Sequence, residues 1–442
     1  MTRPFGSISV LRLGLVQASL GAIVVLTTST LNRVMVVEMA LPALLPGLLL
    51  ALHYVVQISR PRMGHGSDLG RRRTPWIIGG MVTLAAGGWL AALATVWMGS
   101  SAVAGIALAV LAYTLIGLGV AASGTSLLAL LAKRVPAERR AAAATTVWIM
   151  MIVGFVVTAG VAGSLLDPFS PGRLLGVAGG VAASAVLLTV LAVMGLEGPA
   201  QPAAEAPAPI AFKQALVDAW GEPRARRFTV FVFVSMLAFS MQDLILEPFA
   251  GLVFGLTPGA TTQLSGTQHG GALVGMLIAA AAGSRWAGRH WGSLRSWTVW
   301  GCAASALALG GLVCAGLVGP NWPLRLNVFA LGLATGAFSI AAIGSMMGLA
   351  GAGEAGHEGV RIGLWGAAQA MAFALGGVLG TAASDLTRWL LADAGPAYAL
   401  VFLLDAGLFL WAARLAARVE PRARAARINV GERYEPQPAG GL

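Results

Sequence analysis

Ionisable and amide side chains occur inside long apolar segments of this 442-residue chain, where they could bind a ligand or pair with one another. One segment carries Gln242, Asp243 and Glu247, and another carries Arg33 and Glu38. Asp243 and Glu247 are four residues apart, so a helix would place both carboxyl groups on one face. A charge at the centre of a bilayer costs at least about 2.5 kcal/mol. These groups therefore need partners if their segments cross a membrane.

Two histidines and a further acid lie in other apolar segments. His53 is followed by Gln57, and His269 is preceded by Gln268. A neutral imidazole can ligate a metal ion or relay protons, and a hydrogen-bonded structural histidine is the alternative at both positions. Asp405 is the remaining deep acid, and a hydroxyl or amide group on a neighbouring helix could contact it.

The composition predicts which elements must position these side chains. Hydrophobic residues make up 57% of the chain and charged residues only 11%, whereas soluble domains carry about 25% charged residues. Since about 20 apolar residues span a bilayer, we expect twelve transmembrane helices. They fall at about 13–35, 40–59, 75–98, 102–132, 141–166, 173–196, 228–253, 263–283, 296–319, 324–349, 361–384 and 396–417. The fold class predicted is an all-α membrane protein with two six-helix halves.

The expected domains follow from these segments. Residues 1–196 form the first six-helix bundle and residues 228–418 form the second. Residues 197–227 form a cytoplasmic linker, rich in Pro and Ala, which ends in a possible interfacial helix or a plain solvated connector. Residues 419–442, rich in Arg, Pro and Gly, form a disordered cytoplasmic tail.

The positive charges predict the orientation. Of the 29 Lys and Arg residues, 25 fall on the side of the predicted bilayer that holds both termini. The positive-inside rule therefore places both termini in the cytoplasm. Because the charges stand in short clusters between apolar segments, the net charge of +11 reflects topology, and nucleic-acid binding is excluded as a function.

Several kinds of chemistry are not expected. The chain has no nucleophile-elbow, phosphate-loop or zinc-protease motif, so the sequence does not predict an enzyme. Its two cysteines, Cys302 and Cys314, would lie about 18 Å apart along one helix, so we expect neither a disulfide nor a thiolate metal site. No metal ion ligated by the protein alone is expected.

A loop between the second and third segments resembles the G-x-x-x-D-R-x-G-R-R loop of the major facilitator superfamily. It contains Gly64, Asp68, Gly70, Arg71 and Arg72, although it is one residue shorter and lacks the Arg after the Asp. The resemblance implies a cytoplasmic gating loop in which the acid and the arginines pair at helix ends. A turn anchored only by positive charges is the alternative.

The same resemblance predicts where the charged side chains of the two halves meet. In a facilitator fold, the first and seventh helices face one another across the central axis. Arg33 stands 210 positions before Asp243, at the matching place of its half. We therefore expect a latch in which Arg33 pairs with Asp243 or Glu247. The alternative is that these groups reach the headgroup region separately.

Four segments together resemble a more specific family. They are Leu31–Glu38 with Pro42, Ser67–Asp68 with Arg72–Pro75, Gln242–Gly251, and Gly363–Gln369. They are similar to the corresponding segments of the PucC/LhaA-type bacteriochlorophyll delivery family of phototrophic bacteria. The resemblance covers the first to the eleventh helices.

The resemblance implies an assembly factor of the bacterial inner membrane, in its photosynthetic intracytoplasmic part. Such a factor handles or delivers bacteriochlorophyll, or a precursor, while light-harvesting complexes assemble. Its partners would be the lipid bilayer, bacteriochlorophyll, and antenna polypeptides or pigment-synthesis enzymes. His53 or His269 could then ligate the magnesium of the chlorin ring, although the family motifs do not assign a ligand.

Two other functions remain open. The first is a proton-coupled transporter of a small lipophilic compound, in which Asp243, Glu247 or Asp405 takes up the proton. The second is a membrane scaffold that holds assembly partners and binds no ligand. The scarcity of deep charged and amide groups argues against a carrier of polar solutes.

Overall fold

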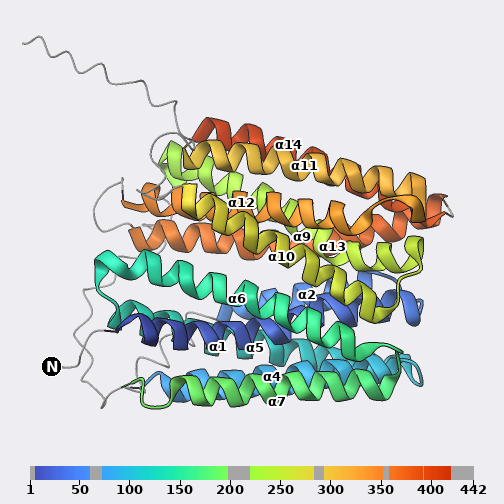
Figure 1. Ribbon diagram of the computed structural model, residues 1–442, viewed down its shortest axis with the longest axis horizontal. Coiled ribbons are helices and arrows are strands. Elements are labelled where there is room, and N and C mark those ends of the chain that lie inside the picture. Colours follow the sequence, from blue (N-terminus) through green and yellow to red (C-terminus); the bar gives the residue numbers. More distant parts are fainter. Residues whose placement is uncertain are drawn as a thin grey trace, which may run out of the picture.

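The computed structural model describes residues 5–59, 72–197, 220–282, 293–351, 358–391 and 393–419. All regular elements in these ranges are helices, and they lie along the long axis of the molecule (Figure 1). The predicted all-α fold is therefore confirmed. The interfacial helix expected in residues 197–227 and the tail expected in residues 419–442 fall almost entirely outside the described residues.

The first half begins with a long helical rod, which is α-helical at its start and continues as two π-helical elements. Its elements are α1 (Ser7–Val25), η1 (Leu26–Leu31), η2 (Val34–Glu38), α2 (Leu44–Val56), η3 (Gln57–Ser59), α4 (Thr74–Met98), α5 (Ala102–Arg134), α6 (Ala137–Leu166) and α7 (Pro171–Val193). Pro171 occupies the first position of α7, and Ser170 caps this helix by accepting a hydrogen bond from the Arg173 nitrogen. Both features are typical helix starts.

The second half repeats the six-rod pattern. Its elements are α9 (Pro223–Phe254), α10 (Pro258–Ala282), α11 (Leu294–Val318), η5 (Gly319–Asn321), α12 (Leu324–Gly351), α13 (Glu358–Leu391) and α14 (Ala394–Val419). Helix α9 stops at Gly255, which has a φ of 64° and so takes the left-handed conformation common after a helix.

Among the described residues, ten rods have the length and apolar composition of a membrane span, with α1, η1 and η2 counted as one. The two others are α2, a shorter apolar helix, and α10, whose N-terminal half carries polar residues between Thr261 and His269. The chain is thus a multi-pass integral membrane protein. Its rods alternate in direction, so Ser7 and Val419 lie at one end of the molecule. We call this the proximal end and the other the distal end.

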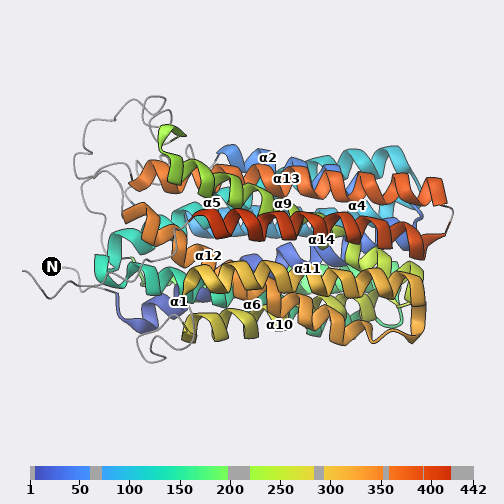
Figure 2. The ribbon, with the colours of Figure 1, turned by 90° about the horizontal axis from the view of Figure 1, so that it is seen from above.

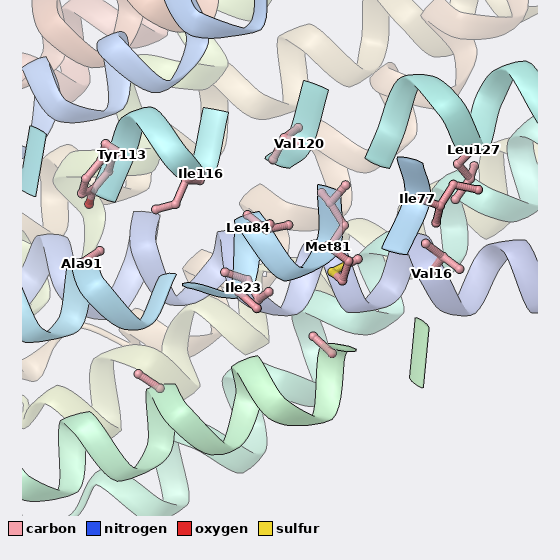
Figure 3. Packing of buried hydrophobic residues seen from close by; sticks show 14 of the residues in the cluster. Val16, Ile23, Ile77, Met81, Leu84, Ala91, Tyr113, Ile116, Val120 and Leu127 are labelled. Carbon is pink, nitrogen blue, oxygen red and sulfur yellow. The ribbon is translucent and has the colours of Figure 1, made fainter. Parts of the chain in front are cut away.

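Each half has its own hydrophobic core. In the first half, α1 contributes Ile23, α4 contributes Met81 and Leu84, and α5 contributes Ile116 and Val120 (Figure 3). The second half has a separate core between Phe228 and Val419, rich in phenylalanine. In a membrane, the dense van der Waals packing of these side chains holds each bundle together.

Glycine lets the two halves approach closely along two helix pairs, α2 with α13 and α6 with α10 (Figure 2). A Cβ at Gly47 of α2 would come within 2.2 Å of the Thr381 hydroxyl oxygen of α13. A Cβ at Gly163 of α6 would come within 2.8 Å of the Gly259 carbonyl oxygen of α10. Small residues serve this role in many membrane proteins, because two helices with glycine at their point of contact can approach backbone to backbone.

Candidate functional site

The site begins with the π-helical part of the first rod. A π-helix contains more residues per turn than an α-helix and often marks a functional site. Here it includes a run of hydroxyl residues, Thr27, Thr28, Ser29 and Thr30, in an otherwise apolar segment. This run was not selected from the sequence, although hydroxyls grouped inside an apolar span are a signal that could have revealed it.

Ser29, Thr30 and Asn32 each make a polar contact that joins this rod to the second half. Ser29 Oγ donates a hydrogen bond to Oε1 of Glu247. The hydroxyl oxygens of Thr30 and Thr262 lie 2.9 Å apart. Asn32 Nδ2 donates to the Leu244 carbonyl oxygen at 2.6 Å. The first rod is therefore fastened to both α9 and α10 in the distal part of the molecule.

Arg33 takes part in this connection, but with other partners than predicted. The guanidinium group pairs with the Glu38 carboxylate and donates to the Leu256 carbonyl oxygen at 2.6 Å. The expected ion pair of Arg33 with Asp243 or Glu247 is therefore wrong. The π-helix supplies the reason, because its repeat brings residues five apart onto one side and so sets Glu38 beside Arg33. The carbonyl group of Leu256 follows the end of α9, where a positive charge is favourable.

Glu247 and Asp243 lie on one face of α9, as the spacing predicted. Glu247 is buried, with Thr261 and Ser265 of α10 beside its carboxyl group, and its Oε2 atom has no hydrogen bond. Asp243 is one turn nearer the proximal end and is partly exposed. A carboxyl group on this face can therefore interact with a molecule between the halves.

His269 lies on α10, one turn proximal to Ser265. Its Nδ1 atom is 2.8 Å from the Ser265 carbonyl oxygen. Its ring meets the Phe155 ring of α6 edge to face, with 4.8 Å between the centroids. The side chain is partly exposed and contacts α6, so this histidine lies at the interface between the halves rather than in the core of one half.

The other predicted site residues lie elsewhere. His53 of α2 is only 3% exposed, and its Nε2 atom is 2.8 Å from Gln57 Nε2. Gln242 and Asp405 are completely buried within the second half, and their terminal polar atoms have no hydrogen bond. These three residues are thus not grouped with Asp243 and His269 at the interface.

The predicted gating loop is largely outside the described residues. Gly64, Asp68, Gly70 and Arg71 lie outside the described residues, and Arg72 is exposed. The end of the loop is held by Glu197, which was not selected from the sequence. Its carboxylate accepts hydrogen bonds from the backbone nitrogens of Arg73 and Thr74, each at 2.8 Å.

Two further acids missed from the sequence join the halves at the distal end. Asp385 of α13 accepts hydrogen bonds from the Ala43 and Leu44 nitrogens at the start of α2. Asp167 accepts one from the Thr257 hydroxyl at 3.0 Å. Both acids stand at the ends of apolar segments, where a sequence cannot distinguish a contact between halves from a solvated charge.

The site can close the distal end and present a few polar groups between the halves. Within the residues that the structure describes, no three His, Cys, Asp or Glu side chains gather where they could hold a metal ion. Asp243 contributes a partly exposed carboxyl group and His269 a partly exposed imidazole.

Comparisons with known proteins agree with this architecture. The chain is 52% identical over 423 residues to the Bacteriochlorophyll synthase 44.5 kDa chain of Rhodobacter capsulatus, which covers 96% of this chain and 98% of that protein. It is 32% identical over 398 residues to Protein PucC of the same species, covering 85% of this chain and 83% of that one.

Solved structures share the fold at low sequence identity. A D-xylose-proton symporter superposes with a TM-score of 0.69 at 15% identity, covering 93% of this chain and 97% of the symporter. This similarity shows a major-facilitator-like fold and nothing about the substrate. The family described as PUCC protein matches residues 30–423. The chain therefore belongs to the PucC family of membrane proteins.

Proposed function

We propose that this protein handles bacteriochlorophyll or a precursor and delivers it while light-harvesting complexes assemble, without altering the pigment chemically. The observation that carries the proposal is the similarity over nearly the whole chain to a Rhodobacter capsulatus protein whose name refers to bacteriochlorophyll synthase. The major-facilitator-like fold favours a carrier or holder of the pigment over a catalytic subunit.

The chemistry of the interface supports an amphiphilic ligand. Asp243 and His269 lie on long helices of a chain in which 57% of the residues are hydrophobic, which suits a flat ring with a long isoprenoid tail better than a sugar. Such a molecule would enter sideways from the bilayer. Antenna polypeptides or pigment-synthesis enzymes would be the partners that receive or supply it.

The proposed location is the bacterial inner membrane, in its photosynthetic part, with both termini in the cytoplasm. The distribution of Lys and Arg supports this orientation, because 25 of 29 fall on the side of the termini. The proximal end then faces the cytoplasm, and the polar contacts of Arg33, Asp167 and Asp385 lie toward the periplasm.

Purification from a phototrophic host tests the proposal. The protein is extracted in mild detergent, and its visible and near-infrared spectrum is recorded with the molar ratio of pigment to protein. We expect bacteriochlorophyll in near-stoichiometric amount. The same protein from a host without pigment, incubated with bacteriochlorophyll, provides the second route. If neither preparation retains pigment, the proposed function is wrong, and antenna polypeptides that co-purify without pigment would instead support a scaffold.

A proton-coupled carrier of a small lipophilic compound is a second candidate. It is favoured by Asp243, a partly exposed acid inside the membrane-spanning part for which the structure shows no hydrogen bond among the described residues. Uptake into vesicles that depends on a pH gradient, and that is lost in Asp243→Asn, would support this candidate. Pigment binding that is unaffected by the same substitution would favour the first.

A further inference from the structure

The hydrogen bond of His269 determines which of its ring nitrogens can bind a ligand. Nδ1 lies 2.8 Å from the Ser265 carbonyl oxygen, and a carbonyl oxygen can only accept a hydrogen bond. Nδ1 must therefore carry the proton. In the neutral ring, Nε2 then carries a lone pair.

The Nε2 atom is also accessible. The hydrogen bonds of His269 use only Nδ1, and Nε2 is not among the buried polar atoms of the described residues. His53 differs, because its Nε2 is engaged by Gln57 and its Nδ1 is buried. Of these two histidines, only His269 presents a nitrogen that a bound molecule could reach.

The Phe155 ring holds the imidazole at the interface. It meets the His269 ring at an interplanar angle of 81°. Gly21 of α1 also lies close to the Phe155 ring, because a Cβ at this glycine would come within 2.9 Å of it. Three helices therefore meet at this point. Gly21 of α1 leaves room for the Phe155 ring of α6, and this ring packs against the His269 ring of α10.

The position of His269 along α10 places it proximal to the distal closure. Thr262, which contacts Thr30, lies on the same side of α10, two turns or about 10 Å away. Glu247 contacts Ser265, the residue one turn distal to His269, and Asp243 is one turn proximal to Glu247 on α9. Asp243 and His269 are therefore at similar depth on facing helices, and a ligand from the proximal side could meet both.

We propose that Nε2 of His269 is the axial ligand of the central magnesium of a bacteriochlorin bound between α6, α9 and α10. This inference rests on the proposed function and names its binding site. The four ring nitrogens of a bacteriochlorin hold magnesium in a plane and leave an axial position open. An imidazole oriented by a hydrogen bond from its other nitrogen to a carbonyl oxygen is the usual arrangement of a metal-binding histidine.

A comparison of two pigments tests the ligation separately from pigment binding. Purified protein is titrated with bacteriochlorophyll and with its metal-free analogue, bacteriopheophytin, and the dissociation constants are compared. We expect the wild-type protein to prefer the magnesium pigment by at least about 10-fold, as expected for loss of a metal contact. His269→Leu should bind both pigments equally and should shift the absorption band that reports magnesium coordination.

Two further variants make the result specific. His269→Gly should bind the magnesium pigment weakly, and added imidazole should restore the wild-type spectrum. His53→Leu is the matched control and should keep the wild-type preference. If the wild-type protein binds both pigments equally, or if His269→Leu keeps the preference and the spectrum, the ligation is wrong while pigment handling stands. If the wild-type protein binds neither pigment, the proposed function itself fails.

A variant that does not fold would not prevent the test. The preference of the wild-type protein for bacteriochlorophyll over bacteriopheophytin is measured without any variant, and its absence would itself overturn the ligation. The wild-type protein can also be alkylated at His269 before pigment is added. The complex formed afterwards should then show a changed coordination band, and an unchanged band would also overturn the proposal.

Discussion

The carboxylate of Asp385 holds the first turn of α2, with its Oδ2 atom 2.8 Å from the Leu44 nitrogen. Its Oδ1 atom accepts a second hydrogen bond from the Ala43 nitrogen at 3.0 Å. An acid at a helix start satisfies backbone groups that the helix itself leaves unpaired. Because Asp385 belongs to the second half and α2 to the first, this helix cap also joins the two halves.

Removal of this cap should loosen α2 and the distal closure together. We expect Asp385→Ala to lower stability by about 1–2 kcal/mol, the usual effect of losing a helix cap. Thermal unfolding in detergent measures the stability, and hydrogen exchange should increase at the Ala43 and Leu44 amides. The control is Asp393→Ala, because Asp393 caps Gly395 within its own half. Faster exchange at Ala43 in the control would contradict the assignment.

The close contact of α6 with α10 should depend on Gly259. A Cβ there would lie 2.5 Å from the Gly163 carbonyl oxygen and from the Asp167 carboxyl group. We expect Gly259→Ala to destabilise the protein by about 1–3 kcal/mol, because the backbones must separate. Gly270→Ala on the same helix meets nothing within 4 Å and should be neutral or slightly stabilising. Equal melting temperatures of the two variants would show that the contact does not matter.

Glu197 should control the start of α4 at the proximal end. Its carboxylate accepts hydrogen bonds from the Arg73 nitrogen, the Thr74 nitrogen and the Thr74 hydroxyl. Glu197→Ala removes all three, and we expect a loss of about 1–2 kcal/mol with faster hydrogen exchange at both amides. Glu197→Gln keeps one acceptor oxygen and should show a smaller change. The idea fails if exchange in Glu197→Ala equals that of the wild-type protein.

The helical architecture could be predicted because a bilayer imposes one simple rule on the sequence. Each span needs about 20 apolar residues, and its backbone groups can pair only within the helix or in a closed barrel. Even α2 and α10 were found, although one is short and the other carries polar residues. The domain boundaries remain a prediction, because residues 198–219 of the linker lie outside the described residues.

The partners of the site residues could not be predicted, for two physical reasons. The first is local, because a regular α-helix does not place Glu38 beside Arg33, and nothing in the sequence indicated the π-helical turns. The second is tertiary, because the caps by Asp385 and Glu197 join residues far apart in the chain. The contact of Asn32 with a backbone carbonyl group also has no signature, since every residue carries that group.

The π-helical pairing of Arg33 with Glu38 leads to the last prediction, in which the two partners contribute unequally. Arg33 is 3% exposed and also holds the Leu256 carbonyl oxygen, whereas the Glu38 side chain is 38% exposed. Arg33→Gln should therefore lower stability by about 1–3 kcal/mol, because the Leu256 carbonyl oxygen and the Glu38 carboxylate both lose the guanidinium group. Glu38→Gln should change stability by less than about 1 kcal/mol, since water can replace much of a partly exposed ion pair. Thermal unfolding of both variants, with Arg33→Lys as a third, measures the difference. A larger loss in Glu38→Gln than in Arg33→Gln would mean that the ion pair, rather than the contact with α9, holds the first rod against the second half.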